Sequence, residues 1–86
     1  MDPLSRSLGA AIRAAPVSRR ALARAAKVSP ALLDFIVQGE RAATPPVARA
    51  VARALDTLAR RCARQARAIE RAVNRAGRRP GREEAS

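Results

Sequence analysis

The sequence predicts an all-α protein, on two observations. Apolar residues recur at spacings of three and four along most of the chain, which gathers them on one face of a helix. A capping residue followed by proline occurs at Asp2-Pro3, Ser29-Pro30 and Thr44-Pro45, and this pair is typical of a helix N-terminus. No segment shows the alternation of apolar and polar residues that a half-buried strand needs.

The first two helices have clear boundaries in the sequence. We expect the first to begin at Pro3, capped by Asp2, and to close at Pro16. The second begins after Ser18, which is a favourable N-cap residue. Helical spacing places three apolar residues of this second helix inward: Leu22, Ala25 and Ala26.

The third helix is short and the fourth is long. We expect the third to span 30 to 37 and to be ended by Gly39, with a loop from 39 to 44. Nothing then interrupts a helix from Val47 to Gly77, which would reach about 45 Å. Its apolar residues form one continuous stripe, made of Val51, Leu55, Leu58, Cys62, Ala66, Ile69, Val73 and Ala76.

These elements divide the chain into three parts. We expect a small helical domain over 1–56 and a long basic amphipathic helix over 57–77. The last part, 78–86, has Pro and Gly but no apolar anchor, so it is predicted to be a disordered tail.

The composition is strongly basic. The chain has 18 Lys and Arg against 7 Asp and Glu, a formal net charge of +11, and favours an anionic partner, most commonly nucleic acid. Because it has no His and one Cys, a Cys/His zinc site and a Cys-His nucleophile pair are excluded. We therefore expect no enzyme, no cofactor and no small-molecule substrate.

The location in the cell is predicted from what the N-terminus and the apolar segments lack. Arg6 and Arg13 interrupt any signal-like apolar run after Met1, and no uncharged stretch approaches the roughly 20 residues of a membrane span. We expect a cytoplasmic, nucleoid-associated protein with no membrane partner.

Residues 21–41, ALARAAKVSPALLDFIVQGER, resemble the helix-turn-helix of the XRE or Cro/C1-type DNA-binding domains. The pattern is carried by Leu22-Ala23, Val28-Ser29, Leu33 with Ile36, and Gly39-Glu40-Arg41. The resemblance covers residues 8 to 55 and implies a lambda-repressor-like fold, with a small residue, Ala23, at a close helix crossing. The chain departs from the pattern at Lys27, where the family usually has Gly with a positive φ, and at Arg19, where it often has Gln.

The resemblance also implies a DNA-binding site. Contacts to the DNA backbone would come from the start of the second helix, from the N-terminus of the third and from the segment after it, here Arg19, Arg20, Ser29 and Arg41. The major groove would face the outward arc of the third helix, here Ala31, Asp34, Phe35 and Gln38. In that arc Asp34 could accept from cytosine, Gln38 could pair with adenine and Phe35 could touch a thymine methyl group.

Two of these residues have other interpretations. Phe35 is the only aromatic residue of the chain, and it could complete the core instead. Asp34 could be a surface charge paired with a neighbouring arginine. An exposed Phe35 beside Asp34 would indicate a contact with another protein.

The long helix carries charge and apolar residues on opposite sides. The charged arc consists of Arg53, Arg60, Arg64, Arg67, Arg71, Arg75 and Arg78. Within it Arg60, Arg64, Arg67 and Arg71 are candidates for additional contacts to the DNA backbone, and a solvated charged face is the alternative. A membrane-surface helix is disfavoured, because that role needs larger apolar anchors.

The apolar side of the long helix is expected to pack on a second copy of the chain. The predicted dimer interface consists of Leu55, Leu58, Cys62, Ala66, Ile69 and Val73. Cys62 is interpreted as a small residue of this seam.

Taken with the resemblance, these features predict a dimeric, sequence-specific DNA-binding transcriptional regulator, a repressor of phage, plasmid or bacterial origin. Its partners would be double-stranded DNA and a second copy. Two alternatives stay open. One is a protein-interaction module with the same fold, such as a phage-encoded inhibitor of a host protein. The other is a nucleic-acid binder without sequence preference.

Overall fold

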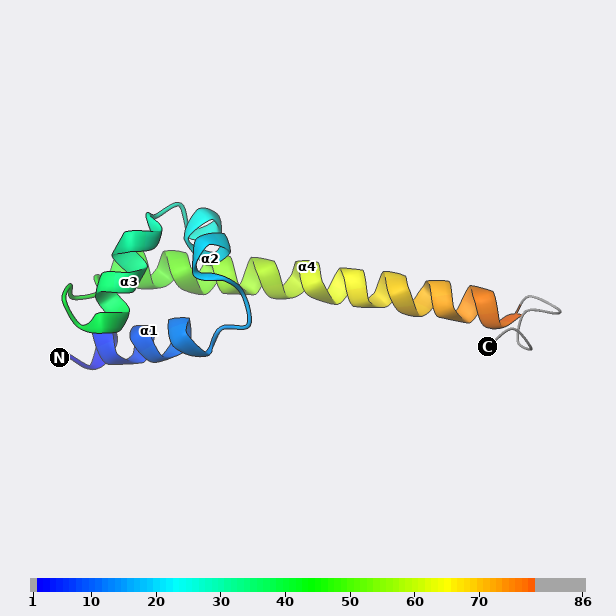
Figure 1. Ribbon diagram of the computed structural model, residues 1–86, viewed down its shortest axis with the longest axis horizontal. Coiled ribbons are helices and arrows are strands. Elements are labelled where there is room, and N and C mark those ends of the chain that lie inside the picture. Colours follow the sequence, from blue (N-terminus) through cyan, green and yellow to red (C-terminus); the bar gives the residue numbers. More distant parts are fainter. Residues whose placement is uncertain (1, 79–86) are drawn as a thin grey trace.

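The computed structural model describes residues 2–78, and every regular element in that range is a helix. The elements are α1 (Pro3–Ala14), α2 (Arg19–Ala26), α3 (Pro30–Gln38) and α4 (Pro45–Arg78). The first three helices gather around the start of α4, and the rest of α4 extends away from them (Figure 1). The molecule accordingly measures 61 × 20 × 20 Å. The all-α prediction is confirmed; of the predicted tail, Arg78 ends α4 and 79–86 lie outside the described residues.

Each helix begins at a residue that the sequence marks as a cap. Each capping side chain accepts a hydrogen bond from a backbone N–H of the first turn, which otherwise has no partner within the helix. The pairs are Asp2 with Ser5 at 3.0 Å, Ser18 with Ala21 at 3.0 Å, Ser29 with Leu32 at 3.1 Å and Thr44 with Val47 at 3.4 Å. The predicted helix starts are confirmed.

Helices α2 and α3 both end at a residue in the left-handed conformation. These residues are Lys27, with φ 62°, and Gly39, with φ 81°. After Lys27 the Val28 N–H donates to the carbonyl of Ala23 at 3.0 Å, a bond typical of a helix that ends in a left-handed residue. After this closure α3 begins with only three residues, 27–29, intervening, and Lys27 adopts the positive φ expected at its position.

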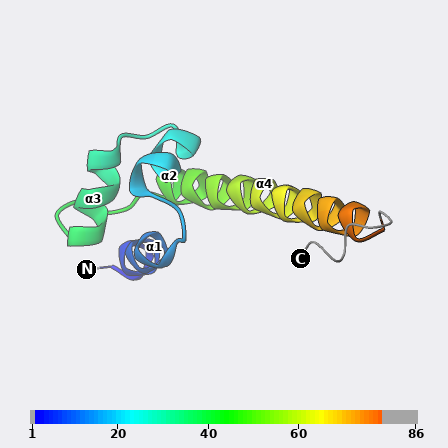
Figure 2. The same ribbon diagram turned by 45° about the vertical axis from the view of Figure 1, so that its right-hand side comes forward.

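The core lies where α1, α2 and α3 meet the first half of α4 (Figure 2). Its most completely buried large side chains are Leu22, Leu33, Ile36 and Val51. Ala23 has no exposed surface, as expected for a close helix crossing. The expectation that Ala25 faces inward is wrong, because it lies on the side of α2 that borders an open groove with α4.

A buried serine joins α1 to the loop before α4. Ser5 is 1% exposed, and its hydroxyl donates to Asp2 Oδ1 at 2.6 Å while accepting from the Ala43 N–H at 2.8 Å. The same hydroxyl and the Ser5 N–H lower the pKa of the Asp2 carboxyl below its ordinary value of 3.8. This small network holds the loop against α1 and thereby sets where α4 begins.

Helix α4 runs without a break through the predicted boundary between residues 56 and 57. Its first half packs on the core through Val51 and Ala54, and Leu55 and Leu58 are partly buried there. From 59 to 77 every residue is exposed, and Ile69 and Val73 are 65% and 63% exposed. The apolar stripe is therefore covered by the chain at one end and uncovered along the rest.

Candidate nucleic-acid interface

The outward arc of α3 is open to solvent. Ala31, Phe35 and Gln38 are exposed and Asp34 is half-buried, whereas Leu33 and Ile36 on the other side of the helix are buried. The structure therefore brings the four residues predicted to face the major groove onto one accessible face.

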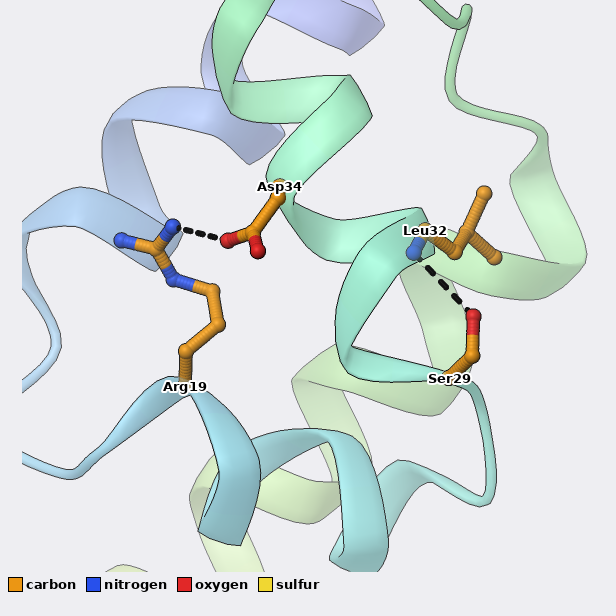
Figure 3. A network of polar contacts seen from close by, with 4 residues as sticks. All are labelled: Arg19, Ser29, Leu32 and Asp34. Carbon is orange, nitrogen blue, oxygen red and sulfur yellow. Dashed lines mark hydrogen bonds and ion pairs between the residues drawn. The ribbon is translucent and has the colours of Figure 1, made fainter.

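Arg19 and Asp34 form an ion pair within this region (Figure 3). Arg19, the first residue of α2, donates from Nη1 to Asp34 Oδ1 in the middle of α3 at 2.7 Å. The two side chains are 35% and 48% exposed, so the net contribution to stability is below about 1 kcal/mol. The structure therefore agrees with the interpretation of Asp34 as a surface charge paired with an arginine. Its carboxylate and the Arg19 guanidinium therefore offset each other.

Ser29 acts as a helix cap, and its hydroxyl is engaged by the Leu32 N–H (Figure 3). Pro30 has no N–H, and the Ala31 N–H forms no hydrogen bond within residues 2–78. A free amide at a helix N-terminus is a favourable donor to a phosphate oxygen. At this end of α3 the Ala31 amide is therefore a backbone donor without a partner in the described residues, and Ser29 caps the helix beside it.

Arg20 and Arg41 are exposed cations before and after α3 in the chain. Within the described residues neither side chain forms an ion pair. The backbone N–H of Arg41 donates to the Phe35 carbonyl at 3.3 Å, which anchors the segment that follows the Gly39 cap. Unlike Arg19, both guanidinium groups are available to an anion.

Phe35 and Gln38 give the outward arc its chemical character. Phe35 is 38% exposed and lies outside the buried core cluster. The interpretation that it completes the core is therefore wrong. Gln38 is exposed and carries an amide, which can donate to and accept from a base edge at the same time. Among the four arc residues, Gln38 offers the most complete hydrogen-bonding group.

A second cationic surface runs along the uncovered half of α4. We call it the arginine ridge, and it consists of Arg60, Arg64, Arg67, Arg71 and Arg75. All five are exposed; Arg60 pairs with Asp56, and the other four form no ion pair within residues 2–78. Arg78 continues the arc in sequence, but its side chain lies outside the described part of the chain.

The residues of the predicted dimer interface fall into two groups. Cys62, Ala66, Ile69 and Val73 are exposed along the far half of α4. Leu55 and Leu58 are partly buried against the chain's own core. A second copy would therefore find its apolar contacts mainly beyond Leu58.

A groove of about 460 Å³ between α2 and α4 contains none of the predicted contact residues. Alanines line it together with Lys27, Arg53, Thr57 and Arg61, so it has cations but no carboxylate for acid–base chemistry. Residues 2–78 contain no group of three His, Cys, Asp or Glu side chains that could hold a metal ion. In the same range, no helix has both the length and the apolar character needed to traverse a bilayer.

Comparisons of the chain with protein-family models, with curated proteins and with solved structures give no match. The resemblance of residues 21–41 to the XRE or Cro/C1-type domains stays a prediction from the residues quoted for it.

Proposed function

We propose that the protein is a sequence-specific DNA-binding transcriptional regulator, a dimeric repressor of phage, plasmid or bacterial type that acts in the cytoplasm on the nucleoid. The observation that carries the proposal is the unit formed by α2, its three-residue turn and α3. Its second helix keeps one face open, and exposed Arg20 and Arg41 stand before and after that helix. Such a unit presents a helix to the major groove and cations to the phosphates on either side.

The residues of the unit divide the work of recognition. Arg20, Arg41 and the Ala31 amide hold phosphates and set the register, while Gln38 reads a base edge by paired hydrogen bonds. Phe35 supplies an apolar contact of the kind a thymine methyl accepts. Repression then follows from occlusion, because a protein bound across a promoter blocks access to it.

The Arg19–Asp34 pair limits DNA binding without sequence preference. Because Asp34 offsets the Arg19 charge, the outward face of α3 adds little to attraction for phosphate. Discrimination between sequences would then rest on Gln38 and Phe35.

Dimerisation follows from the uncovered half of α4. Ile69 and Val73 leave an apolar stripe exposed there, and helices in proteins gain most of their stability by packing such a face. In the dimer, the apolar stripe of one copy packs on the apolar stripe of the other. The two arginine ridges stay apart because each lies on the opposite side of its helix. Two recognition helices related by a two-fold axis read an inverted repeat.

The test is equilibrium binding to the DNA upstream of the gene, with random duplex of equal length as competitor at one stated salt concentration. We expect a preference of about a thousandfold or more for the upstream DNA. Gln38→Ala should remove most of this preference. The matched control is Gln65→Ala, which removes an exposed amide from α4 and should leave the preference intact.

Two other results would contradict the proposal, and each indicates a different function. Equal affinity for both duplexes would indicate a nucleic-acid binder without sequence preference. No binding to either duplex would indicate a protein-interaction module, and the 38% exposed Phe35 beside Asp34 is the surface that favours this second candidate.

A further inference from the structure

The arginine ridge forms a straight line of charge. Its five residues follow each other at spacings of three and four, and Arg60 and Arg75 are separated by about 22 Å along the helix axis. A DNA duplex carries one negative charge per about 1.7 Å of its length. Along the ridge a duplex therefore offers more phosphates than there are guanidinium groups to bind them.

The ridge is electrostatically unfavourable in the free protein. Neighbouring ridge arginines are about 5–6 Å apart on the helix surface, which is within the Debye length of about 8 Å at physiological salt. Asp56 pairs with Arg60, but Arg64, Arg67, Arg71 and Arg75 have no acidic partner within residues 2–78. A bound polyanion would remove this repulsion and stabilise the uncovered half of α4.

The ridge and α3 lie at opposite ends of the molecule. Figures 1 and 2 both show α3 at one end and the free half of α4 extending from the other, in a molecule 61 Å long. The ridge also lies on the side of α4 opposite the apolar stripe, which the core covers at Val51. A duplex seated on α3 therefore leaves the ridge open to another segment.

We propose that the arginine ridge is a second duplex-binding surface without sequence preference, and that the protein uses it to bridge two DNA segments. The bridge rests on the proposed function for its first duplex, which α3 holds. The arc of the ridge contains no apolar residue larger than alanine, whereas the centre of a protein interface needs apolar groups. A purely ionic contact of this kind matches a phosphate backbone better than an acidic protein.

The experiment is a bridging assay with two duplexes of equal length: the bead-bound duplex is the DNA upstream of the gene, and the fluorescent duplex has random sequence. One duplex is fixed to beads, the full chain is bound to it at saturation and washed, and retention of a second, fluorescent duplex is measured. The ridge variant carries Arg64→Gln, Arg67→Gln and Arg71→Gln. The control variant carries Arg13→Gln, Arg24→Gln and Arg61→Gln, which lowers the net charge by the same three units at exposed positions outside the ridge.

We expect the wild type and the control variant to retain the second duplex and the ridge variant to lose most of it. The ridge variant should also lower the slope of log affinity against log salt for the second duplex by about 2 to 3. Duplex DNA should raise the melting temperature of the wild type more than that of the ridge variant.

Three results would overturn the proposal. In the first, the ridge variant retains the second duplex as well as the wild type does; in the second, the wild type does not retain it. In the third, poly-glutamate displaces the second duplex from the wild type as well as unlabelled duplex of the same charge does. The last would identify an acidic protein as the occupant. Failure of the proposed function is distinguishable. A ridge variant whose α3 does not bind DNA is itself lost from the beads at the wash, whereas under the proposal it stays on the beads and loses only the second duplex. Circular dichroism of each variant shows whether it keeps its helices.

Discussion

Single polar groups position the larger elements of this molecule. The Ser5 hydroxyl, buried in α1, holds the backbone of Ala43 and so fixes the loop that leads into α4. Lys27 adopts a left-handed conformation that closes α2 and permits the three-residue turn to α3. Asp34 holds the side chain of Arg19 at the start of α2. Each of these roles predicts the effect of a single substitution.

Replacing Ser5 with alanine should destabilise the protein by about 1–3 kcal/mol, because the buried Ala43 N–H loses its acceptor. Thermal or urea unfolding measures the change. Ser7→Ala is the matched control, since Ser7 is exposed on the same helix and its loss should change stability by less than about 0.5 kcal/mol. Equal effects of the two substitutions would show that the Ser5 hydroxyl has no structural role.

Replacing Lys27 with glycine should stabilise the protein by about 0.5–1 kcal/mol, because glycine has no Cβ to oppose a φ of 62°. Lys27→Ala removes the same charge but keeps the Cβ, so it should bring no comparable gain. The prediction fails if both variants unfold at the same denaturant concentration.

Replacing Asp34 with alanine should raise affinity for random duplex several-fold, because the Arg19 guanidinium is released from its partner. Fluorescence anisotropy at fixed salt measures the gain. Asp56→Ala is the comparison variant: it frees Arg60 of the arginine ridge, so it reports the gain in affinity expected at the other surface. A gain for Asp56→Ala and none for Asp34→Ala would show that the duplex does not approach α3.

At the level of elements, the sequence predicted most of the fold and only part of the site. The caps and prolines located every helix start, because these signals act within one turn. The ion pair of Arg19 with Asp34 and the bond from Ala43 to Ser5 join residues 15 and 38 positions apart, which no local pattern contains. Ala25 was misplaced because helical spacing indicates a face without showing which neighbour covers it. The uncovered end of the apolar stripe likewise depends on how far the small domain reaches along α4.

The proposed role of the apolar stripe of α4 in dimerisation can be tested by substitution. Ile69→Asp with Val73→Asp should raise the dissociation constant of the dimer by about 100-fold or more, because each copy loses two apolar side chains from the interface and charges would be buried. Sedimentation equilibrium measures the association. Ala63→Asp with Asn74→Asp adds two acids at exposed positions away from the stripe and should leave the dimer intact. A wild type that is monomeric at high micromolar concentration would contradict the proposed dimer.

In the molecule as a whole, which has a net charge of +11, the two proposed DNA-binding surfaces differ in charge and chemistry. The face of α3 is nearly neutral and carries the groups that we propose distinguish one base from another. The arginine ridge is strongly basic, and we propose that it contacts the phosphate backbone. Sequence preference and overall affinity are thus expected to depend on different ends of the protein and to be separable by substitution.

The most direct test of sequence reading by α3 is selection of bound duplexes from a random library, with the wild type and Gln38→Ala in parallel. We predict that the wild type enriches an inverted repeat with half-sites about one helical turn, or a multiple of it, apart. In Gln38→Ala the preference at one position of each half-site should be relaxed. Absence of any enriched sequence for the wild type, or an identical repeat selected by both proteins, would contradict the proposed role of α3.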